Sequence, residues 1–110
     1  MAENNLIKKE SAKQYLGFFL NEKEFYFPIS LIEGIVEVPK ITRLPNSQSY
    51  VEGVINFRGQ IMPVIDTQKR LNLGEVKKTS KNRVVIVRCF NRLLGFIVDS
   101  VKKVLEIPDK

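Results

Sequence analysis

Two aspartates and one cysteine are the first candidates in this 110-residue chain for an acid, a base or a nucleophile. Asp66 and Asp99 each follow an apolar run, and Cys89 is the only cysteine. Histidine is absent, which excludes histidine-based acid–base relays and histidine metal sites. A single cysteine likewise excludes metal sites built from cysteine pairs. Two catalytic carboxylates would also need contrasting environments, which the sequence does not indicate. We therefore predict that each aspartate caps a turn by accepting hydrogen bonds from neighbouring backbone N–H groups, and that Cys89 is a small buried apolar side chain. We also predict that the protein is not an enzyme and uses no cofactor or metal.

Positive charge is the second candidate for a function. The chain has 18 Lys and Arg against 12 Asp and Glu, a net charge of +6. Several cations fall in one polar segment, namely Lys77, Lys78, Lys81 and Arg83. A basic β-barrel with exposed aromatic side chains is one design for binding single-stranded nucleic acid. The three tyrosines and seven phenylalanines lie mostly at apolar strand positions, however, and glutamates interrupt the basic segments. Nucleic-acid binding is therefore the alternative function, not the favoured one.

The apolar pattern predicts short strands, with turn residues recurring about every ten positions, as in an all-β barrel or a pair of barrels. Hairpins are predicted over residues 15–27, 51–65 and 83–98. Helical segments are predicted where apolar residues recur at helical spacing: after Pro28 (Ile29, Ile32, Ile35 and Val36), as one turn over 68–73, and after Asp99 (Val101, Val104 and Leu105). Gly34 weakens the first of these helices, and Pro39 ends it.

The N-terminal segment, residues 1–14, is polar, and we expect it to be a flexible lead-in to a domain over residues 15–110. It lacks the apolar core of a signal peptide, and the apolar runs of the chain are too short to span a bilayer. A single cysteine also agrees with a reducing compartment. We expect a cytoplasmic protein without direct membrane insertion.

The most specific segment is the hairpin around Arg58. Gly53, Gly59 and Pro63 bracket its two apolar strands, and Gly59 allows the positive φ of a tight turn. Arg58 is a single long cation at the rim of this apolar hairpin. It is either a solvated turn residue or a fork that holds two backbone elements or a partner's carboxylate.

Residues 53–66 (GVINFRGQIMPVID) resemble the signature of the CheW-like domain family. Residues 41–46 (ITRLPN) and 95–105 (GFIVDSVKKVL) resemble the same family, and the likeness extends from about Tyr15 to Pro108. Separated blocks in the right order are more specific than one short motif. The resemblance implies an all-β fold of two small SH3-like five-stranded β-barrel lobes with short helices and an apolar groove between the lobes.

The resemblance also implies a function and residues for it. The family's members are non-catalytic adaptors of bacterial chemotaxis, which link the cytoplasmic tips of chemoreceptors (methyl-accepting chemotaxis proteins) to the regulatory domain of a histidine kinase. Carried over by position, the receptor-binding groove comprises Ile32, Ile35, Gly53, Asn56, Arg58 and Gly59. The interface with the kinase or another partner, placed in the second lobe, comprises Gly95, Val101 and Val104.

This chain departs from the family pattern in two ways. Many relatives carry a glutamate on the short helix that pairs with the hairpin arginine, whereas this chain has Gly34; Glu33 or Glu37 would substitute only if the helix is rotated. The family also continues past Pro108 with a closing strand pair and a terminal helix. A lobe without these strands exposes edges and apolar faces, which invites pairing with another chain. We therefore expect an incomplete second lobe, with a dimer, strand exchange or a shortened chain as the explanations.

Overall fold

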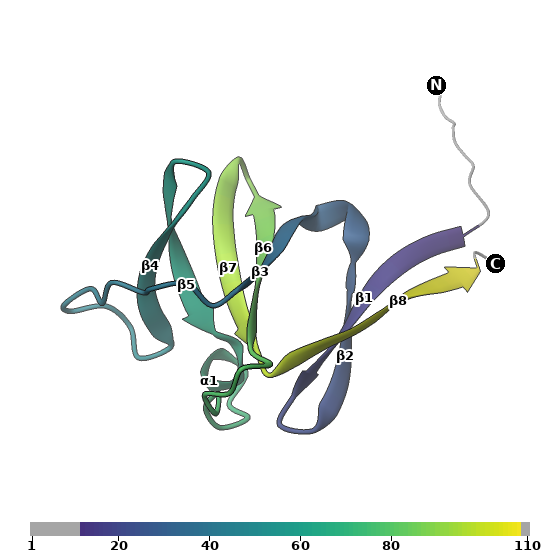
Figure 1. Cartoon of the computed structure of the whole chain (residues 1–110), viewed down its shortest axis with the longest axis horizontal. Helices are drawn as coiled ribbons and strands as arrows, with labels where there is room; N and C mark the ends of the chain where they lie inside the picture. Colours follow the sequence, from purple (N-terminus) through teal and green to yellow (C-terminus); the bar gives the residue numbers. More distant parts are fainter. Residues whose placement is uncertain (1–11, 109–110) are drawn as a thin grey trace.

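The computed structural model describes residues 12–108, with side chains from residue 14 to residue 102. Its elements are β1 (Ala12–Leu20), β2 (Lys23–Pro28), the 3-10 helix η1 (Ile29–Leu31), β3 (Ile32–Glu37), β4 (Val51–Phe57), β5 (Gln60–Asp66), α1 (Thr67–Arg70), β6 (Arg83–Cys89), β7 (Arg92–Val98) and β8 (Ser100–Pro108). They form a three-stranded sheet in the order β2-β1-β8, here the small sheet, and a five-stranded sheet in the order β3-β6-β7-β5-β4, here the large sheet (Figure 1). The predicted all-β class is confirmed.

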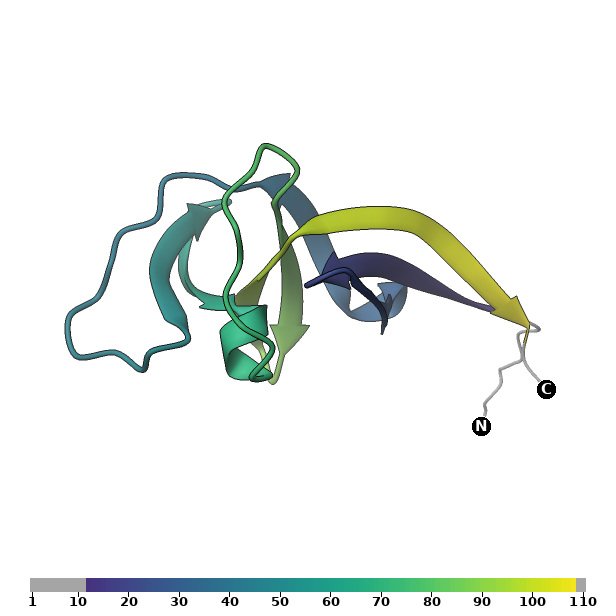
Figure 2. The ribbon, with the colours of Figure 1, turned by 90° about the horizontal axis from the view of Figure 1, so that it is seen from below.

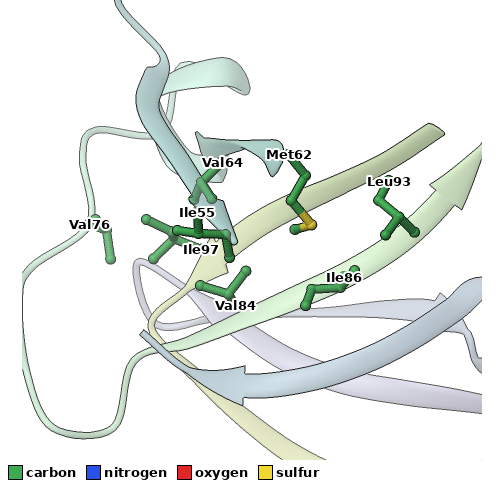
Figure 3. Close-up of a cluster of buried hydrophobic side chains, with 8 residues drawn as sticks. All are labelled: Ile55, Met62, Val64, Val76, Val84, Ile86, Leu93 and Ile97. Carbon is green, nitrogen blue, oxygen red and sulfur yellow. The ribbon is translucent and has the colours of Figure 1, made fainter. Parts of the chain in front are cut away.

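The large sheet encloses its own apolar core (Figure 3). Its buried members come from β4 to β7 and the loop after α1: Ile55, Met62, Val64, Val76, Val84, Ile86, Leu93 and Ile97. The two outer strands of the sheet approach each other at this core, because a Cβ added to Gly34 of β3 would lie 3.1 Å from the ring of Phe57 on β4. The sheet is therefore strongly curved, and Phe57 fills the space between its outer strands.

A second core lies between the two sheets. Leu16 and Leu20 of β1 pack with Val85 and Val87 of β6 and with Val98 of β7. Since β6 is covered on both faces, its sequence VVIV is apolar at four successive buried positions instead of alternating. Figure 2 shows β1 and β8 side by side as they extend away from the large sheet.

Two predicted helical segments are strands, and these predictions were wrong. Residues 32–37 form β3, which pairs with β6, and only η1 is helical in this region. β-branched side chains and Gly34 favour an extended edge strand over a helix here. Likewise, Val101, Val104 and Leu105 lie in β8, which pairs with β1. In both cases pairing with a distant strand overrides a short helical pattern.

Other local predictions have mixed outcomes. All three hairpins are confirmed, and the helical turn predicted over residues 68–73 is present as α1, which begins one residue earlier and ends at Arg70. Cys89 is exposed at the end of β6, so its predicted burial was wrong, because the strand leaves the covered region before it turns. Strand β1 begins at Ala12, within the predicted lead-in, and the rest of that lead-in, residues 1–11, lies outside the described residues.

The outer face of the small sheet carries one coupled ion pair. The Lys102 ammonium on β8 hydrogen-bonds the Glu24 carboxylate on β2, and the Tyr26 hydroxyl donates to the same carboxylate at 3.2 Å. The bonds from Lys102 and Tyr26 lower the pKa of Glu24 below its ordinary value, and the bond to Glu24 raises the pKa of Lys102. The ion pair therefore stabilises the folded state only while both groups are charged. This contribution is lost as pH falls through the lowered pKa of Glu24, or as pH rises through the raised pKa of Lys102.

We predict that Lys102→Met raises the pKa of Glu24 toward its ordinary value of 4.5. The substitution removes the main hydrogen bond to the carboxylate and keeps the length of the side chain. NMR titration of the Glu24 side-chain carbonyl measures the shift, with Lys23→Met as the matched control. An unchanged Glu24 midpoint in Lys102→Met would show that the pair does not form in solution.

Candidate protein-binding site

Asp66 fixes the end of β5 and the start of α1. One carboxylate oxygen, Oδ1, accepts hydrogen bonds from the backbone N–H of Gln68 at 3.0 Å and of Lys69 at 3.3 Å. The other, Oδ2, accepts from the backbone N–H of Val76 at 3.0 Å. The side chain is buried, and all of these bonds are to backbone donors. The predicted capping role of Asp66 is therefore confirmed.

Asp99 links the two sheets at the junction of β7 and β8. Its carboxylate accepts from the backbone N–H of Asn21 in the β1–β2 turn at 2.8 Å and from Nε2 of Gln68 at 2.6 Å. Its own backbone N–H donates to the carbonyl of Phe19 at 3.0 Å. Asp99 therefore caps the distant β1–β2 turn instead of a turn of neighbouring residues as predicted, and it also holds the small sheet against α1. The spacing of the two sheets, and of any groove between them, depends on this junction.

An apolar groove of about 250 Å³ lies between the two sheets. One wall comes from the small sheet and the other from the large sheet and α1, and the lining consists of Phe18, Phe25, Tyr26, Phe27, Thr67, Leu71, Val85, Val87, Phe96 and Val98. Such a surface binds apolar side chains and offers few polar partners. None of the six residues predicted for a receptor groove is among its described lining residues.

The predicted groove residues of β3 and β4 have different environments. Ile32 is half-buried and packs into the core between the sheets, whereas Ile35 is 41% exposed. Gly53 is buried with φ +149°, and a Cβ there would lie 2.2 Å from the carbonyl oxygen of Thr42. Of these three residues, therefore, Ile35 offers the most surface to a partner, and Gly53 shapes the strand.

Asn56, Arg58 and Gly59 come together in the β4–β5 turn. The side-chain oxygen of Asn56 accepts the N–H of Gly59 at 3.0 Å, and Arg58 has φ +52°. The Arg58 guanidinium lies 4.7 Å from the centre of the Phe57 ring, a cation–π contact. Among the described residues no carboxylate pairs with Arg58, which leaves its fork of donors accessible to a partner.

The sequence left open whether Glu33 replaces the missing glutamate at Gly34. In the structure Glu33 pairs with Arg88 of β6, with 3.2 Å between the carboxylate and Nε. Glu37 lies at the opposite end of β3, where it lines a separate cavity. The family's pairing with the hairpin arginine is therefore not reproduced among the described residues.

The residues predicted for a kinase interface are divided between the sheets. Gly95 is buried on β7 of the large sheet, where an added Cβ would lie 2.8 Å from both Met62 and Val84. Its predicted place in the second lobe was wrong, because β7 pairs with β6 and β5. Val101 is half-buried on β8 and packs on the core between the sheets. Val104, also on β8, pairs with Leu16 of β1, and the side chain of Val104 lies outside the described part of the structure.

Two exposed apolar side chains were missed by the sequence reasoning. Ile61 of β5 is 67% exposed, and Phe90 in the β6–β7 turn is 94% exposed. Strand alternation with buried Met62 was a signal for Ile61, since neighbours on a strand face opposite ways. The pair Phe90–Asn91 occupies a two-residue turn, and its exposure follows from that position.

The fold and these surfaces define an all-β domain with an apolar groove between two sheets and an accessible arginine at a hairpin turn. The chain belongs to the CheW-like domain family, whose model matches residues 14–110. No helix in the described part of the chain is long and apolar enough to cross a membrane.

Individual relatives support the assignment. The chain is 35% identical over 100 residues to a chemotaxis protein CheW of Bacillus subtilis, covering 91% of this chain and 64% of the relative. It is 35% identical over 96 residues to that of Thermotoga maritima, covering 87% and 63%. A crystal structure of a scaffolding protein TtCheW from Thermoanaerobacter tengcongensis matches with a TM-score of 0.83 and 36% identity over 86% of this chain and 65% of that one. The chain therefore spans just under two thirds of the length of these relatives.

Proposed function

We propose that this chain is a non-catalytic adaptor of bacterial chemotaxis in the cytoplasm. It couples the cytoplasmic tips of chemoreceptors to the regulatory domain of the chemotaxis histidine kinase. The observation that carries the proposal is the apolar groove between the sheets of a CheW-like domain, whose relatives are chemotaxis and scaffolding proteins. An adaptor needs surfaces and no reactive groups, and the two internal aspartates serve as caps.

The receptor contacts the groove between the sheets and the turn that carries Arg58. An apolar side chain that is fully buried there contributes about 1.5–3 kcal/mol. Arg58 adds a bidentate donor for a carboxylate, which orients the partner and raises the association rate more than it raises the affinity. Ile35, Asn56 and Gly59 complete the receptor surface. Ile32 and Gly53 do not contact the receptor but hold the strands of this surface in place through packing.

The kinase domain contacts the β8 side of the small sheet, where Val101 and Val104 lie, with Gly95 acting only through the packing of β7. In the described sheet β8 pairs with β1 alone, so one edge of β8 is open. An open edge also supports the expected dimer or strand exchange between copies. Phe18, Phe25 and Phe27 lie between the sheets instead of on an outer basic face, and this position argues against nucleic-acid binding through these three rings.

We predict that Arg58→Ala and Ile35→Asp each weaken binding to a receptor-tip fragment about tenfold, the effect of a typical interface anchor. Both residues are exposed, so the far-UV circular dichroism spectrum stays unchanged. Ile32→Asp is unsuitable because Ile32 packs in the core between the sheets. Isothermal titration calorimetry measures the affinity, with Leu44→Asp, 45% exposed in the segment between β3 and β4, as the control. Wild-type affinity in both variants would exclude this receptor surface.

A further inference from the structure

The β4–β5 and β6–β7 turns lie at the same end of the large sheet. Strands β5 and β7 pair in parallel, with Val64 opposite Gly95 and Ile65 opposite Phe96. Because each turn immediately precedes one of these strands, parallel pairing places the turns side by side, as Figure 1 shows at the top of the view. A shallow hollow of about 390 Å³ between them is lined by Gln60, Ile61, Pro63, Asn91, Arg92 and Leu93.

The backbone at Phe90 is in an unfavourable conformation. Phe90 has φ +52° and Asn91 has φ +65°, which is the pattern of a type I′ turn. Such a turn favours asparagine followed by glycine, and a bulky side chain at positive φ is strained. Packing within the described part of the chain does not compensate for this strain, because the ring is 94% exposed. A strained and solvated aromatic ring is a cost to the free protein, and burial against a partner would offset it.

The same end of the sheet is positively charged. Arg92 lines the hollow, and Arg58 lies in the adjoining β4–β5 turn; both are exposed, and no acidic residue is among the hollow's described lining residues. Together Arg58, Ile61, Phe90 and Arg92 form what is here named the tip surface: two apolar side chains flanked by two cations. Aromatic rings and arginines are the residue types enriched in the energetically dominant part of protein interfaces.

We propose that the tip surface is a second contact for the receptor, with Phe90 and Ile61 as its apolar anchors. The partner chemistry is a pair of apolar side chains flanked by carboxylates, since the flanking groups here are arginines. The inference rests on the proposed function and extends the receptor contact from Arg58, which belongs to both surfaces. A second copy of this chain is disfavoured as the occupant of this surface, because a symmetric contact through it would bring the arginines of the two copies together.

The decisive variant is Phe90→Asn. Asparagine accepts positive φ readily, so this variant should be at least as stable as the wild type while it loses the ring. Loss of stability therefore cannot explain loss of binding. Ile61→Thr keeps a β-branched residue in β5 and removes apolar surface, and Leu44→Ser is the matched control at an exposed apolar position elsewhere.

The experiment is titration calorimetry of these variants against a receptor-tip helical hairpin fragment and, separately, against the kinase regulatory domain. We expect about tenfold weaker receptor binding for Phe90→Asn and Ile61→Thr, unchanged kinase binding, and wild-type behaviour for Leu44→Ser. If Arg58→Ala weakens receptor binding but Phe90→Asn and Ile61→Thr do not, the tip surface is refuted and the proposed function stands. Loss of kinase binding alone, or of self-association alone in sedimentation, would assign the surface to another occupant and overturn the inference. If the wild type binds neither probe, the proposed function fails and the inference with it.

Discussion

Replacing Asp66 with alanine is expected to lower the free energy of unfolding by about 3 kcal/mol, a large part of the stability of a domain of this size. The carboxylate is 1% exposed and accepts from the backbone of Gln68, Lys69 and Val76. Alanine leaves buried donors unpaired, and each such donor costs about 1–3 kcal/mol, partly relieved by water. The same change releases α1 and the following loop, which contributes Val76 to the large-sheet core.

Urea denaturation followed by circular dichroism measures this loss. Asp66→Asn keeps an acceptor toward α1 but presents an amide NH₂ group toward the N–H of Val76. We therefore expect its loss of unfolding free energy to be smaller than that of Asp66→Ala but still clear. Glu75→Ala, at an exposed carboxylate in the same loop, is the control and should have almost no effect. A loss in Asp66→Ala no larger than that in Glu75→Ala would contradict the capping role.

Gly53→Ala has the second large expected effect, again about 3 kcal/mol of destabilisation. At φ +149° an added Cβ would lie 2.2 Å from the carbonyl oxygen of Thr42 and 2.7 Å from Ile41. The first of these is a backbone atom that pairs with β4 through the Thr42–Val54 bridge, so it cannot rotate away as a side chain would. The chain after β3 must therefore shift, or β4 must lose its register with β5.

Gly59→Ala is the matched control, because it separates backbone strain from steric overlap. Gly59 has φ +81°, and an added Cβ there meets nothing within 4 Å. The expected cost is only about 1 kcal/mol, from the positive φ alone. Equal losses in the two variants, measured by the same urea titrations, would show that the close approach of Thr42 to Gly53 is not present in solution.

The sequence predicted those parts of the fold that neighbouring residues determine. The hairpin over residues 51–65 follows from strand alternation and the Arg58–Gly59 turn, and the turn after β5 follows from the capping carboxylate of Asp66. Strands β3 and β8 were missed, because each is stabilised by pairing with a strand far away in sequence. A short apolar run is compatible with both the helical and the strand periodicity, and pairing with a distant strand decides which structure forms.

The residues of the candidate site likewise differ in whether local sequence or long-range strand pairing determines their position. Arg58 could be singled out because its turn is local and its charge is isolated within an apolar segment. Gly95 was assigned to the wrong lobe, since its sheet depends on the pairing of β7 with β5 and β6. Phe90 and Ile61 become neighbouring features only through the parallel pairing of β5 with β7, and no pattern within either hairpin indicates it. The groove lining likewise combines residues from both sheets.

An adaptor of the kind proposed here binds its two partners at the same time. Sedimentation velocity of the chain, mixed with a receptor-tip helical hairpin fragment and the kinase regulatory domain, resolves binary from ternary complexes. We expect a ternary complex in which the presence of one partner leaves the affinity for the other unchanged. Displacement of one partner by the other, or the absence of either binary complex, would contradict it.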